Sequence, residues 1–298
     1  MTAIFRPTVA AAALAILFCG SAAAKTDRPA CPEHFQDGRA PVLVEPKLTP
    51  RTRTLCYSGY AVLFSGLTRT PLWSAEHLTA QRVGAARGQD RVNAFHPDPN
   101  LPAEERSELS DYARSGYDRG HMAPSGDMPD AQSQEESFSL ANMIPQDAEN
   151  NRHLWAKIES GVRDLAAEAG DVYVVTGPVF AGENVQSLKG RVLVPTQIYK
   201  AVYIPKRASA AAYLAENGPG QEVRVLSLSK LRLLTGLDPF PALSQEVKDR
   251  AATLPMPIPG RRRPDTVANR PSAEYDPPTT GGLVEDMLRD IDRLRSRP

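Results

Sequence analysis

The feature of this sequence that most restricts its fold is one helix-like stretch followed by several strand-like runs. In "HLWAKIESGVRDLAAEA" (153–169), apolar residues recur at i, i+4, i+8 and i+11, which predicts a helix with one buried face that ends at Gly170. The runs "VYVVTGPVF", "RVLVPTQIYKAVYIP" and "EVRVLSL" are rich in branched residues and predict strands. Because no internal repeat is visible, we expect about 200 residues to form one domain of mixed helices and strands.

Both ends of the chain differ from this central domain. Residues 1–24 contain one early cation, an apolar run and the small-residue sequence "SAAA", which together are typical of a secretory signal peptide. The apolar run is short for a membrane span, and a lipid anchor on Cys19 is the alternative interpretation. Residues 25–254 are expected to form the domain, beginning with a loop-rich lead-in over 25–55. Residues 255–298 are rich in Pro and Arg and predict a disordered tail.

The tail ends in "LVEDMLRDIDRLR", whose apolar residues fall on one helical stripe over 283–295. This pattern predicts a short terminal helix, which is either marginally stable in solution or docks on a partner. No membrane span is expected in the chain.

Cysteine usage and charge restrict the location and the partners of the protein. Removal of the signal peptide leaves Cys31 and Cys56, and in a periplasmic or secreted protein this pair favours a disulfide over two free thiols. The chain has 35 basic and 35 acidic residues, so its net charge does not indicate nucleic-acid binding. A site for a polyanion must therefore be a local patch.

The stretch "SGYDRGHMAPSGDM" (115–128) places an acid, an arginine and a histidine around one glycine. We expect Gly120 to let the backbone turn sharply there. A histidine with an ordinary pKa of about 6.5, such as His121, can take a proton from water at neutral pH. Arg119 beside it offers a forked donor for phosphate oxygens. The stretch predicts a site that binds an anion and moves a proton.

A second cluster lies in "NMIPQDAENNRHLWAKIE" (142–159). On a helical wheel Asn151 falls in the apolar sector, and an inward amide must be hydrogen-bonded or bound to a cation. Glu159, two turns on, lies at the edge of that sector and could share the site. The alternative for Asn150 or Asn151 is a helix N-cap. An amide with a nearby carboxylate suits Mg²⁺, whereas no HExxH or CxxC spacing indicates zinc and no GxxxxGK[ST] loop indicates nucleotide-triphosphate hydrolysis.

Taken in order, "YDRGHMAP", "NMIPQ", "NN" and "LWAKIE" resemble the DNA/RNA non-specific endonuclease family. The resemblance is close over roughly 90–165 and looser to about 250. It implies an α+β protein with the ββα-metal nuclease fold, in which a central, mainly antiparallel sheet is flanked by helices. It implies an endonuclease that acts on DNA and RNA, leaves 5′-phosphate ends and shows little sequence preference.

The same resemblance implies roles for individual residues. His121 would be the general base, Asn151 the direct protein ligand of a single Mg²⁺ (with Mn²⁺ as a substitute), and Glu159 would orient water at the metal. Further residues of the site would be the phosphate-binding Arg119, the nearby Asn142 and, upstream in "RVNAFHPDP", Arg91. The resemblance is also compatible with a homodimer.

Two other functions compete with a nuclease. One is an extracytoplasmic phosphodiesterase or nucleotidase that acts on small phosphate esters with the same metal machinery, which the near-neutral charge allows. The other is a non-catalytic secreted binding protein that retains the scaffold. All the expected site residue types are present, which disfavours a degenerate site.

Overall fold

The computed structural model describes residues 30–182 and 185–257. The predicted signal peptide (1–24) and terminal helix (283–295) lie outside the described residues, as does the predicted tail beyond residue 257. Within the described ranges, no helix is both long and apolar enough to cross a membrane.

The described residues form a mixture of short helices and longer strands. The helices are α1 (Ala80–Ala86), α2 (Leu109–Tyr112), α3 (Ala131–Ser137), α4 (Ala156–Ala169), α5 (Leu228–Thr235) and α6 (Gln245–Asp249). The longer strands are β2 (Thr52–Cys56), β3 (Ala61–Ser65), β4 (Thr70–Thr79), β5 (Tyr117–His121), β6 (Met143–Asp147), β7 (Asp171–Val179), β10 (Gln197–Ile204), β11 (Ser209–Glu216) and β12 (Val223–Leu226). The two-residue strands are β1 (Val42–Leu43), β8 (Ser187–Leu188), β9 (Val192–Leu193) and β13 (Leu237–Asp238).

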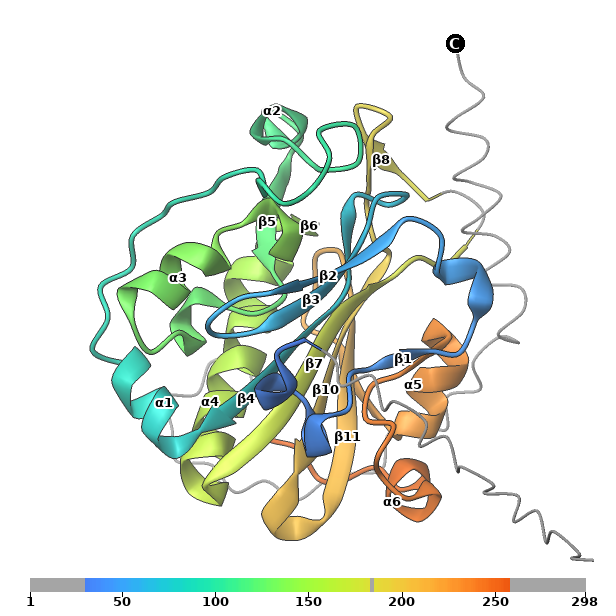
Figure 1. Ribbon diagram of the computed structural model, residues 1–298. Helices are drawn as coiled ribbons and strands as arrows, with labels where there is room; N and C mark the ends of the chain where they lie inside the picture. Colours follow the sequence, from blue (N-terminus) through green and yellow to red (C-terminus); the bar gives the residue numbers. More distant parts are fainter. Residues whose placement is uncertain (1–29, 183–184, 258–298) are drawn as a thin grey trace, which may run out of the picture.

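A seven-stranded sheet in the order β12-β11-β10-β7-β4-β3-β2 forms the centre of the molecule (Figure 1). All of its neighbouring strands are antiparallel. Helix α4 covers one face and α5 lies on the opposite side (Figure 1). These features confirm the predicted α+β class and the central antiparallel sheet.

Alternation along the strands creates two separate cores. On β4, Leu78 packs in the cluster of α4, whereas Trp73 and Ala75 pack in the cluster of α5. Successive side chains of a strand point to opposite faces, so a sheet covered on both sides needs apolar residues at nearly every position. This explains why the strands appear in the sequence as continuous apolar runs.

The predicted long helix is present, but it begins earlier than residue 153. Asn150–Trp155 form a π-helical segment that runs directly into α4. The Asp147 carboxylate accepts a hydrogen bond from the backbone N–H of Asn150 at 2.9 Å and so caps the first turn. The prediction that Asn150 or Asn151 is the N-cap is therefore wrong. Gly170, with φ of 100°, ends α4 as predicted.

The stretch around Gly120 is a strand, not a turn. β5 pairs with β6 in a separate two-stranded sheet that places Gly120 opposite Ile144. Gly120 does not have a positive φ, so the predicted sharp turn is wrong. A Cβ atom at this position would overlap the Gln146 side chain, with only 2.5 Å to the Gln146 Cβ. Glycine is needed here because another side chain crosses the backbone closely.

Two further predictions concern the ends of the described domain. Cys31 and Cys56 form the predicted disulfide, which joins the lead-in to the end of β2. The sequence "SQEVKDRAATL" (244–254) predicts a last helix of the domain, and the structure forms only part of it, as α6. After α6 the chain is extended from Arg250, and Ala252 donates its backbone N–H to the Ala210 carbonyl at 2.9 Å.

Candidate active site

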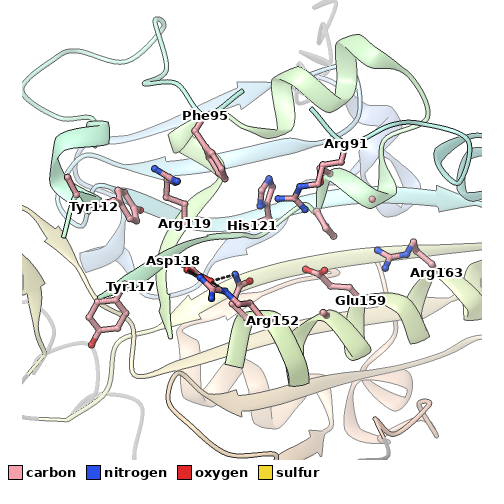
Figure 2. Close-up of a pocket in the computed structure, with 16 residues that line it drawn as sticks. Arg91, Phe95, Tyr112, Tyr117, Asp118, Arg119, His121, Arg152, Glu159 and Arg163 are labelled. Atoms are coloured by element: carbon pink, nitrogen blue, oxygen red, sulfur yellow. Dashed lines mark hydrogen bonds and ion pairs between the residues drawn. The ribbon is translucent and has the colours of Figure 1, made fainter. Parts of the chain in front are cut away.

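A cleft of about 780 Å³ lies between β5, the segment before it, and the helix that begins with the π-helical segment. Figure 2 shows its lining side chains converging from these elements. Of the six predicted site residues, five line this cleft, namely Arg91, Arg119, His121, Asn151 and Glu159. The tertiary structure thus brings the two sequence clusters into one place. Asn142 is not among the lining residues.

His121 is held by aromatic rings at the end of β5. It is 8% exposed, and its ring centroid lies 5.0 Å from Phe138 and 5.7 Å from Phe95. Its Nε2 atom is buried and has no hydrogen-bond partner among the described residues. Nδ1 is therefore the ring nitrogen that a water in the cleft can reach.

The surroundings of His121 favour its neutral form. Burial and, to a smaller extent, the positive charges of Arg91 and Arg119 together lower the pKa of His121 to about 3. The ordinary pKa expected from the sequence is therefore wrong. The imidazole is unprotonated at neutral pH, which is the state that can accept a proton.

Two arginines flank the histidine, one on each side (Figure 2). The Arg119 guanidinium lies over the Phe95 ring at 4.2 Å, and that of Arg91 lies over the Phe138 ring at 5.3 Å. These contacts seat both cations on the same rings that enclose His121. The cleft therefore presents positive charge beside a neutral base.

The π-helical segment presents the Asn151 amide in a defined orientation. Its Nδ2 donates to Asp118 Oδ2 at 2.9 Å. A carboxylate only accepts hydrogen bonds, so the amide nitrogen must face Asp118 and the amide oxygen is left for another partner. Arg152 holds the same carboxylate with two hydrogen bonds of 2.7 and 2.9 Å (Figure 2). Asp118 thus joins β5 to the segment that carries Asn151.

Helix α4 contributes a carboxylic acid, Glu159, and a guanidinium, Arg163, to the cleft. Burial raises the pKa of Glu159 to about 7, against the opposing charges of Lys200 and Arg163. Arg163, one turn further along α4, also lines the cleft and donates to Asp127 Oδ1 at 2.7 Å. Sequence reasoning missed Arg163, although its i, i+4 spacing from Glu159 was a usable signal.

The donor atoms in the cleft fit a hard divalent cation that takes few protein ligands. Within the described residues, no group of three or more His, Cys, Asp or Glu could hold a metal ion. The cleft instead offers the Asn151 amide oxygen and the Glu159 carboxylate. Oxygen donors and few protein ligands are typical of Mg²⁺, which keeps several of its waters.

Asn142 is wholly buried behind the cleft. Its Nδ2 donates to the carbonyls of Ala123 (2.8 Å) and Ser137 (3.0 Å). Its Oδ1 accepts from Ser74 Oγ and from the Ala123 N–H, both at 2.9 Å. Because the protein uses all of these groups, Asn142 anchors the turn that follows His121 and does not face the cleft.

Comparison with known proteins places this arrangement among nucleases. The family model described as DNA/RNA non-specific endonuclease matches residues 42–246. "Nuclease C1" of Cunninghamella echinulata var. echinulata is 39% identical over 176 residues, which cover 55% of this chain and 70% of that protein. "Nuclease EXOG, mitochondrial" of Danio rerio is 34% identical over 212 residues, 64% of this chain and 61% of that protein. The match therefore spans less than two thirds of the Danio rerio protein.

A solved structure supports the same grouping. A chain of the "Crystal structure of the EndoG/EndoGI complex: Mechanism of EndoG inhibition" superposes with a TM-score of 0.59 at 28% sequence identity. The superposition covers 65% of this chain and 88% of that chain. About two thirds of this chain thus shares its fold with a chain of that complex.

Proposed function

The chain belongs to the DNA/RNA non-specific endonuclease family, and from this membership we propose that it is a secreted, Mg²⁺-dependent endonuclease. It hydrolyses phosphodiester bonds of DNA and RNA and leaves 5′-phosphate ends. The observation that carries the proposal is the juxtaposition in one cleft of a neutral histidine, an oriented amide and several arginines.

In this proposal His121 is the general base. Its Nδ1 takes a proton from a water, and the oxygen of that water bonds to the phosphorus in line with the 3′ oxygen; the P–O3′ bond breaks and the 3′ oxygen takes a proton from solvent. Arg91 and Arg119 lower the pKa of His121 in the free protein. A bound phosphate offsets their charge, so substrate binding increases the basicity of the imidazole at the moment when it is needed.

The amide oxygen of Asn151 would hold the Mg²⁺, with Glu159 orienting water in the same part of the cleft. When bound, the cation neutralises negative charge on the phosphoryl and leaving oxygens. Asp118 keeps the amide nitrogen turned away from the cation site through its 2.9 Å hydrogen bond. Asn142 is a positioning residue in this scheme, because it anchors the turn after His121.

Arg119 and Arg91 bind the phosphates on both sides of the reacting position. Such contacts read the backbone of a nucleic acid and not its base edges, so little sequence preference follows. Arg163 adds a further positive charge at the Glu159 end of the cleft.

We also propose that the protein acts in the periplasm or outside the cell. The leader-like pattern of residues 1–24 and the Cys31–Cys56 disulfide support an oxidising compartment. The domain would then span 25–254, with 255–298 as an appended tail. A homodimer and a docking role for residues 283–295 stay predictions.

The decisive experiment is digestion of plasmid DNA and of RNA with Mg²⁺, with and without a chelator. We expect the chelator to abolish cleavage and His121→Ala to lower kcat by about 10²–10⁴-fold, the range for loss of a general base. His77→Ala is the matched control, because His77 is half-buried and lies outside the cleft.

Two outcomes would contradict the proposal. One is cleavage that a chelator leaves unchanged, and the other is near-wild-type activity of His121→Ala. Faster turnover of a dinucleotide or nitrophenyl ester than of long DNA would favour the small-ester phosphodiesterase instead.

A further inference from the structure

One asparagine far along the chain holds the junction between β6 and the π-helical segment. Asn217 directly follows β11. Its Oδ1 accepts from the backbone N–H of Asp147 at 2.8 Å, and its Nδ2 donates to the carbonyls of Pro145 (2.9 Å) and Pro195 (2.8 Å). The side chain therefore uses both of its donors and its acceptor on backbone groups of two other segments.

The contact continues from Asp147 to the next turn. The Asp147 carboxylate accepts from the Asn150 N–H. The buried Asn150 side chain donates through Nδ2 to the Glu216 carbonyl at 2.9 Å and accepts from Gln146 Nε2 at 2.8 Å. Glu216 and Asn217 thus hold both sides of the turn that leads into Asn151.

This turn needs such support because of its geometry. A π-helical turn is less favourable than an α-helical one and occurs mostly as a single turn at functional sites. Here the turn spans Asn150–Trp155 and carries Asn151, whose amide nitrogen is held by Asp118 and whose oxygen is left for a cation. A shift of the turn would move that oxygen relative to Glu159, which lies on α4.

We propose that Asn217 is a positioning residue for the divalent cation: through Asp147 and Asn150 it fixes the turn that aims the Asn151 amide oxygen into the cleft. The inference rests on the proposed function, in which Asn151 holds the metal. Asn217 itself does not line the cleft. Residues that orient a metal ligand typically contribute about 10–100-fold to metal affinity.

The test is a titration of the full-length protein with Mn²⁺, followed by electron paramagnetic resonance, and with Mg²⁺ by calorimetry, both without nucleic acid. Asn217→Ala removes the three side-chain hydrogen bonds, and we expect it to raise the Kd for the cation by about 10–100-fold. Asn217→Asp keeps the acceptor for Asp147 but loses both donors, so its Kd should lie between those of wild type and Asn217→Ala. Asn100→Ala, at an exposed asparagine outside the cleft, is the control and should bind as wild type does.

Cleavage assays provide the second measurement. For Asn217→Ala the half-saturating Mg²⁺ concentration should rise by the same factor, whereas kcat at saturating Mg²⁺ should stay close to wild type. A lowered melting temperature with an unchanged Kd would show a purely structural role and overturn the inference, as would failure of both Asn217 variants to fold. A wild-type protein that binds neither cation would instead overturn the proposed function.

Discussion

At the scale of single residues, burial favours the neutral form of both His121 and Glu159 in the cleft. It lowers the pKa of His121 to about 3 and raises the pKa of Glu159 to about 7. In both cases the charged form is disfavoured because it loses hydration. His121 is thus neutral over the working range of pH, and Glu159 is the group of this pair that titrates near neutrality.

This difference predicts the pH dependence of the enzyme. In the proposed mechanism Glu159 acts in its ionised form, so at low Mg²⁺ kcat/KM should rise as pH increases through about 7, where Glu159 loses its proton. Excess Mg²⁺ should move this rise to lower pH, since a nearby cation favours the carboxylate. The measurement is a pH–rate profile of wild type and Glu159→Gln at two Mg²⁺ concentrations. A Glu159→Gln profile that keeps the rise near pH 7 would show that another group is responsible.

At the scale of secondary-structure elements, the two sequence clusters (115–128 and 142–159) each contain one strand of the same two-stranded sheet. "YDRGH" is β5 and "MIPQD" is β6, and their antiparallel register places Asp118 opposite Gln146. The Gln146 side chain crosses Gly120 and donates to Asn150. The glycine of one cluster, the glutamine of the other and the asparagine pair are therefore one packed unit, which explains why these residue types occur together.

Gly120→Ala should break this unit. The added methyl group would overlap Gln146, and overpacking of this kind costs about 1–3 kcal/mol of stability. We expect a lower urea midpoint and a loss of cleavage activity, with partial rescue in the double variant Gly120→Ala/Gln146→Gly, in which the Cβ atom at position 146 is removed as well.

Gly84→Ala provides the matched control for this experiment. Gly84 lies in α1, and a Cβ added there would meet nothing within 4 Å. Its substitution should leave activity unchanged and stability equal or slightly higher. Equal behaviour of Gly120→Ala and Gly84→Ala would contradict the close approach of Gln146.

At the scale of the whole molecule, the disulfide ties the lead-in to an edge strand of the central sheet. Cys31 and Cys56 are 25 residues apart, and closing such a loop stabilises a protein by about 3 kcal/mol. Urea unfolding of wild type with reductant should show this loss, and the unfolding of Cys31→Ser/Cys56→Ser should not respond to reductant. A wild-type midpoint that reductant leaves unchanged would show that the bond adds no stability.

The sequence by itself determined the features that depend on local pattern and residue chemistry. The 3.6-residue period predicted the body of α4, the even cysteine pair predicted the disulfide, and the two clusters contain most of the residues that line the cleft. These features could be predicted because they follow from spacing along the chain.

Only the tertiary structure decided the features that depend on contacts between distant segments. The alanine-rich strand β11 lacks the β-branched residues that are typical of a strand, and pairing with β10 and β12 forms it. The clamp by Asn217, which lies 70 residues from Asp147, and the low pKa of His121, which burial causes, likewise depend on the packed structure. Hydrogen-bond partners and desolvation are properties of the packed molecule, so no local pattern encodes them.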